Sequence, residues 1–94
     1  MKTSELTGAA LNWAVGKAEG LGGIFAPVDY CGKWEHGGPI IERENICLWT
    51  EGYDWEAKQY GVWEEWASTP LIAAMRCYVG SKLGNDVDVP EELT

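Results

Sequence analysis

The sequence is poor in positive charge. Seven lysines and arginines stand against fifteen acidic residues, and with the single histidine neutral the formal net charge is −8. Proteins that hold DNA or RNA through its phosphates need a basic surface. So few cations cannot supply one, and we expect no direct binding of nucleic acid.

Long apolar runs and closely spaced cysteines are missing as well. No stretch is long enough to span a membrane, and the first residues contain no signal-peptide core. The cysteines, Cys31, Cys47 and Cys77, are odd in number and far apart, which argues against a disulfide scaffold. We therefore expect a protein of a reducing cytoplasm, with free thiols and no membrane contact.

The residue patterns of known catalytic and metal sites are also lacking. Cys31 and His36 are followed only by distant cysteines, which is not the spacing of a zinc finger. Nothing marks Cys31 as a thiolate, because acidic surroundings raise the pKa of a thiol. Glu42 and Glu44 could act as acid and base, but such pairs arise by chance in an acidic protein. We expect no metal, no cofactor and no enzymatic activity.

Tryptophan, in contrast, is abundant. A chain of 94 residues suits one domain, residues 1–94, with a small core. Such a core does not fully enclose many indoles, because tryptophan is rarely buried completely. We expect some to line a groove or the interface of a homo-oligomer, and core packing is the alternative. The six are Trp13, Trp34, Trp49, Trp55, Trp63 and Trp66.

Two segments have the apolar spacing of helices. The spacing predicts helices near residues 7–19 and 70–83. The second has the clearer boundaries, since Thr69 can cap its start, Pro70 suits the first helical position and Gly84 can end it.

The strands are predicted to be short. Residues 24–30, interrupted by Pro27, suggest an edge or bulged strand, and 46–50 and 55–66 provide two or three more. Turns join them, so we expect an α+β fold in which two helices pack on one face of a small antiparallel sheet.

The remaining segments are predicted to be less regular. Residues 32–38 read as a loop, and residues 39–44 as a single helical turn started by Pro39. The tail, residues 87–94, is expected to be extended.

Several blocks of the sequence resemble the NinX-like family of phage and prophage proteins. The blocks are residues 2–15 (KTSELTGAALNWAV), 37–44 (GGPIIERE), 69–79 (TPLIAAMRCYV) and 81–93 (SKLGNDVDVPEEL). The resemblance covers nearly the whole chain, although Asn12 and Gly16 stand where the family prefers Asp and Ala. It implies a phage accessory protein of the host bacterial cytoplasm. Small proteins of this kind often counter host defence, but the family carries no biochemical function to transfer.

A first hypothesis is that the protein binds and sequesters a small nucleotide-derived ligand. Trp34 could stack on a base, the helix start at Thr69 offers N–H donors, and Arg76 offers a planar fork for a phosphate. The alternative is that Thr69 only caps, Arg76 only pairs with an acid and Trp34 only packs. The residues assigned to this pocket are Trp34, Gly37, Gly38, Glu42, Arg43, Thr69 and Arg76.

A second hypothesis is an acidic protein-binding inhibitor of a basic host protein, such as a DNA-binding protein or a nuclease. Residues 1–45 contain six acids and four bases, and residues 46–94 contain nine acids and three bases. The net charges are therefore −2 and −6, so the acidity lies mostly in the second half, and a basic protein partner is compatible with this charge. The alternative is that the acids only maintain solubility.

Overall fold

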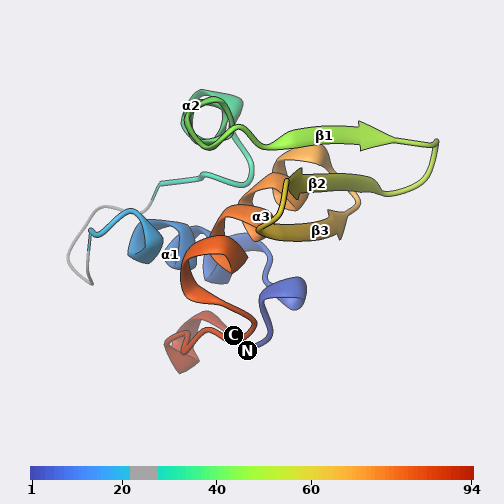
Figure 1. Cartoon of the computed structure of the whole chain (residues 1–94). Helices are drawn as coiled ribbons and strands as arrows, with labels where there is room; N and C mark the ends of the chain where they lie inside the picture. The colour runs from blue at the N-terminus through green and yellow to red at the C-terminus, as the bar shows by residue number, and fades with distance from the viewer. Residues whose placement is uncertain (22–27) are drawn as a thin grey trace.

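The computed structural model describes residues 1–21 and 28–94 of the chain. In these residues a three-stranded sheet is covered on one face by one α-helix, and two further α-helices pack on that helix (Figure 1). The elements are η1 (Thr3–Glu5), α1 (Gly8–Ala18), α2 (Trp34–Glu44), β1 (Cys47–Thr50), β2 (Trp55–Gln59), β3 (Trp63–Ala67), α3 (Pro70–Leu83) and η2 (Glu91–Leu93).

Helix α3 is the centre of the molecule. One of its sides packs on β2 and β3, while α1 and α2 pack on other sides of it (Figure 1). Its residues from Leu71 to Val79 are buried almost without interruption, among them Met75 and Cys77. A helix that is apolar around most of its circumference must be enclosed by other elements, which explains this central place.

The boundaries of α3 are those that the sequence predicts. The Thr69 side chain accepts a hydrogen bond from the Ile72 N–H at 3.1 Å, so the predicted cap is confirmed. Gly84 ends the helix with φ at 86°, a conformation in which a side chain would be strained. The predicted first helix is also confirmed, as α1.

The sheet is antiparallel, with strand order β1-β2-β3, and the predicted α+β class is confirmed. Residues alternate between its two faces. The inner face, toward α3, has buried small residues: Ala57 lies in the middle of β2 and Ala67 at the end of β3. The outer face carries Trp49, Glu56 and Trp66, which are direct register partners across the three strands.

The predicted loop over residues 32–38 is wrong from residue 34 onward, and the helical turn predicted at residues 39–44 is the second half of a longer helix. Helix α2 begins at Trp34 and continues through Pro39 to Glu44. Gly37 is needed for close packing rather than for a turn, because an added Cβ would meet the Tyr30 carbonyl and lie 2.6 Å from Leu71 Cδ1. Pro39 has no N–H to donate to the Glu35 carbonyl. Because Glu35 is exposed, water can donate to that carbonyl instead.

Two further predictions, for residues 24–30 and for the tail, are not confirmed. Most of the strand predicted at residues 24–30 lies outside the described residues, and Val28, Asp29 and Tyr30 are not in a strand. The tail is not wholly extended, because it contains the short helix η2.

Candidate functional site

Most residues of the predicted nucleotide pocket lie on α2. Trp34 is 53% exposed and Glu42 is exposed, but Gly37 is buried against α3. Gly38 lies next to Trp34, since an added Cβ would approach the indole to 3.9 Å. With Arg43, five of the seven predicted residues lie on α2, but they occupy different sides of the helix.

Arg43 has several partners within the chain. Its Nη2 lies 2.6 Å from Glu19 Oε2 and donates to the Tyr78 hydroxyl at 3.2 Å, while its Nε donates to Glu44 Oε2 at 3.0 Å. The Tyr78 hydroxyl also donates to Glu19. The guanidinium of Arg43 holds the pKa of Glu19 below its ordinary value, and burial raises the pKa of Tyr78. This cluster ties α1, α2 and α3 together.

Arg76 also bonds within the chain. Its Nε donates to the Leu6 carbonyl at 2.7 Å and its Nη1 to the Trp66 carbonyl at 2.9 Å. Arg76 and Tyr78 are two positions apart on α3 and therefore point in different directions, so the Arg76 and Arg43 guanidiniums do not converge. The predicted ligand roles of the arginines and of Thr69 stay predictions, and each of these residues has a structural role.

The outer face of the sheet brings aromatic and acidic side chains together. Trp49 and Trp66 are 43% and 51% exposed, with Glu56 between them in the strand register. The turn between β1 and β2 adds the exposed carboxylates Glu51 and Asp54. A surface hollow of about 270 Å³ lies among these groups. We call its lining residues the acidic aromatic face: Trp49, Glu51, Tyr53, Asp54, Glu56 and Trp66.

No cation lines the acidic aromatic face. Among residues 1–21 and 28–94, Glu51, Asp54 and Glu56 form no ion pair. Lys58, two positions after Glu56 on the same side of β2, is close enough to interact with the charge of Glu56, but its ion pair is with Glu64 at 3.2 Å. Unpaired carboxylates beside half-exposed indoles provide a surface suited to a cation, because indole rings attract positive charge over their faces.

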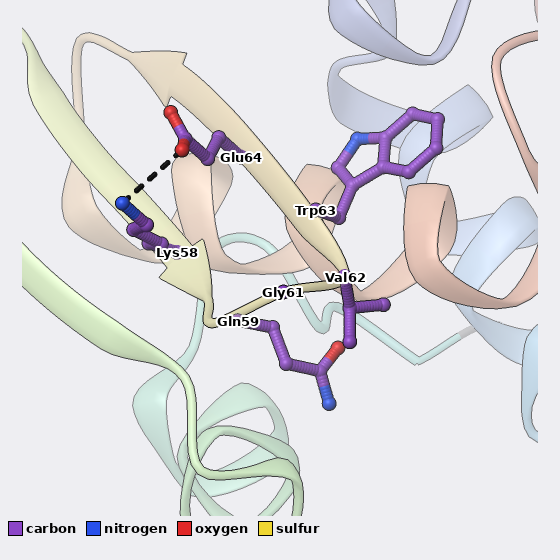
Figure 2. A pocket seen from close by; sticks show the side chains of 6 residues that line it. All are labelled: Lys58, Gln59, Gly61, Val62, Trp63 and Glu64. Atoms are coloured by element: carbon purple, nitrogen blue, oxygen red, sulfur yellow. Dashed lines mark ion pairs between the residues drawn. The ribbon is translucent and has the colours of Figure 1, made fainter.

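A second hollow, of about 320 Å³, lies at the turn between β2 and β3 (Figure 2). Figure 2 shows its side chains pointing apart: Lys58 and Glu64 pair on one side of the sheet, whereas Trp63 points to the other. The Trp63 N–H donates to Glu65 Oε2 at 2.7 Å, and its ring packs on Gly80. Because these groups do not converge, this hollow is the weaker candidate.

The three cysteines are free thiols in different surroundings. Burial raises the pKa of the Cys31 thiol and raises that of Cys77 to about 11, while Cys47 is exposed. In the part of the chain that the structure describes, no group of three or more His, Cys, Asp or Glu side chains could hold a metal ion.

Sequence reasoning noted the tryptophans and the acids of residues 49–66 but did not unite them. The signal was the alternation within the hairpins: Trp49, Glu56 and Trp66 share a face only through the register of two turns. Aligning the three residues from the sequence requires the lengths of both turns, because turn length sets the strand register.

Comparison with known proteins identifies the family. The family model described as "Bacteriophage P22, NinX" matches residues 23–82, which is more than half of the chain. No curated protein matches the sequence. None of the described helices combines the length and the apolar character needed to cross a membrane. The matched segment includes α2, the whole sheet and nearly all of α3, and the chain belongs to the NinX family of bacteriophage proteins.

Proposed function

We propose that this phage protein acts by binding rather than by catalysis, as an acidic inhibitor of a basic host protein in the bacterial cytoplasm. The observation that carries the proposal is the acidic aromatic face, where Glu51, Asp54 and Glu56 form no ion pair with the described residues and lie beside two half-exposed tryptophans. A DNA-binding protein or a nuclease presents the complementary basic surface. Occupying that surface would counter a host defence that depends on DNA.

The two kinds of residue would contribute differently. Carboxylates that meet a positive surface speed the encounter and exclude wrongly charged partners. Tryptophans are frequent binding hot spots, because they bury a large area with few rotatable bonds. Trp49 and Trp66 would therefore supply affinity, and the three carboxylates would supply selectivity and rate.

The test uses purified DNA-binding proteins and nucleases of the host, with binding measured by biolayer interferometry. We expect a complex that weakens with salt, is displaced by DNA and is lost in the Trp49→Ala/Trp66→Ala double variant. Trp34→Ala is the matched control, since Trp34 is equally exposed but lies on α2. Binding that tolerates the double variant, or no binding across the panel, would contradict the proposal.

A second candidate is the sequestration of a nucleotide-derived ligand. The observation that favours it is Trp34, which is half-exposed in the first turn of an 11-residue helix whose start has no side-chain cap. It ranks second because Arg43 and Arg76 already have partners within the chain. Calorimetry with cyclic and ADP-ribose-type nucleotides, using the parent and Trp34→Ala, tests it. Absence of heat with every compound would remove it.

A further inference from the structure

We infer that the hollow between Trp49 and Trp66 receives one arginine side chain of the partner, with its guanidinium between the indoles and against Glu56. The inference rests on the proposed function, because it names the group that the acidic aromatic face would recognise.

The strand register sets the shape of this receptor. Trp49 is paired with Glu56, and Glu56 with Trp66, so the three residues form one row across the sheet. Neighbouring strands lie about 4.8 Å apart, which places the two tryptophan backbones about 10 Å apart with the carboxylate halfway. The row therefore consists of an indole on each side and an acceptor for hydrogen bonds at the base.

Arginine fits this arrangement better than lysine. Its guanidinium is flat and weakly hydrated, so it can stack on indoles, and its fork of N–H donors matches a carboxylate. Lysine presents a compact, strongly hydrated ammonium that can use the charge of Glu56 but cannot stack on the indole rings as a flat group does. Glu51 and Asp54, at the turn, would favour either cation from a greater distance.

The arginine must come from another protein. Within this chain, Arg43 is held by Glu19 and Glu44, and Arg76 by the carbonyls of Leu6 and Trp66. A second copy is a poor source, because each chain has a net charge of −8 and only the same two arginines. A basic partner surface carries many arginines, and charge complementarity directs them to this face.

The experiment uses three blocked tripeptides with glycine on both sides of arginine, lysine or citrulline. Citrulline is the neutral, flat counterpart of arginine. Binding is followed through the indole N–H signals of the intact protein in heteronuclear NMR. We expect the arginine peptide to shift the signals of Trp49 and Trp66 but not Trp34, to bind several-fold more tightly than the lysine peptide, and to leave citrulline without measurable binding.

Variants locate the contact. Glu56→Gln should weaken the arginine peptide about tenfold and Trp66→Ala should abolish its binding, while the controls Glu35→Gln and Trp34→Ala bind as the parent. Thermal unfolding of each variant checks that the fold is retained. Equal binding of arginine and citrulline, or unchanged binding by Glu56→Gln, would overturn the inference.

The two proposals fail in different ways. If a basic host protein binds through the acidic aromatic face but the peptides show no preference for arginine, the inference is wrong and the proposed function stands. If the arginine peptide binds as expected but no basic protein of the panel does, the receptor is present and the proposed function is wrong.

Discussion

Strand β3 carries one tryptophan on each face of the sheet, and the two have different surroundings. Trp63 points inward, packs on Gly80 and donates its N–H to the buried Glu65. Trp66, three residues later, is half-exposed on the acidic aromatic face, and its side chain forms no hydrogen bond with the described residues. Packing on α3 explains why a tryptophan stands at position 63. No contact among the described residues requires the indole of Trp66.

The largest effect should come from removing the inner tryptophan. Trp63→Ala leaves a cavity beside α3 and removes the hydrogen-bond donor of Glu65, so we expect the free energy of unfolding to fall by about 3 kcal/mol. Trp66→Ala should change it by no more than about 0.5 kcal/mol, because the side chain is half-exposed. Urea unfolding of both variants gives the two values. Equal losses would show that the two faces do not differ as described.

The packing of Trp63 can also be tested from the other side of the contact. A Cβ at Gly80 would collide with the indole, so Gly80→Ala should cost about 2 kcal/mol by overpacking. Gly38→Ala is the matched control, since it also lies within a helix but meets only the exposed Trp34, at 3.9 Å. Alanine favours helix, and this control should be neutral or slightly stabilising. A stable Gly80→Ala protein would mean that Trp63 can move aside.

Acid should act on the carboxylates of the helical side. Arg43 holds the pKa of Glu19 below its ordinary value in the folded protein, so the pair stabilises the fold at neutral pH. That contribution is lost as the pH falls through the lowered pKa, and Arg43 is exposed enough to limit it to below about 1 kcal/mol. Chemical unfolding at a series of acidic pH values should give a smaller decline for Glu19→Gln and for Arg43→Met. A decline equal to that of the parent would contradict the assignment.

The smallest effect on the fold is expected from a thiol reagent. Cys47 is exposed on the outer face, while Cys31 and Cys77 are buried with raised pKa values. One thiol should therefore react quickly in the native protein and the other two only after unfolding, with little change in the circular dichroism spectrum. Mass spectrometry after brief labelling counts them. Rapid labelling of Cys77 would mean that α3 is less enclosed than described.

Local sequence signals predicted the parts of the fold whose causes are local. Thr69 and Gly84 mark the ends of α3 by their own chemistry, and short strands joined by turns predicted the antiparallel sheet. The first half of α2 was missed because a Gly-Gly-Pro segment usually interrupts a helix, while the reason for Gly37 is the approach of Leu71 from a distant part of the chain. No local pattern contains that contact.

The candidate site was predictable in composition but not in position. Arg43 pairs with Glu19, and Arg76 donates to the Leu6 carbonyl. Because these partners are remote in sequence, the sequence alone suggested that both arginines were available to bind a ligand. Only the three-dimensional arrangement shows them occupied and shows Glu56 between two indoles. The expected homo-oligomer stays a prediction.

Arg76 has one more consequence, for how the molecule opens. A single guanidinium joins the carbonyl of Leu6, just before α1, to that of Trp66, near the end of β3. Neither segment can separate from α3 without leaving donors of this cation unbonded. The amides of η1 and β3 should therefore exchange with deuterium as one cooperative unit, although about sixty residues of chain lie between them. In Arg76→Met, the N-terminal segment should fray independently, and its exchange should accelerate before that of the sheet.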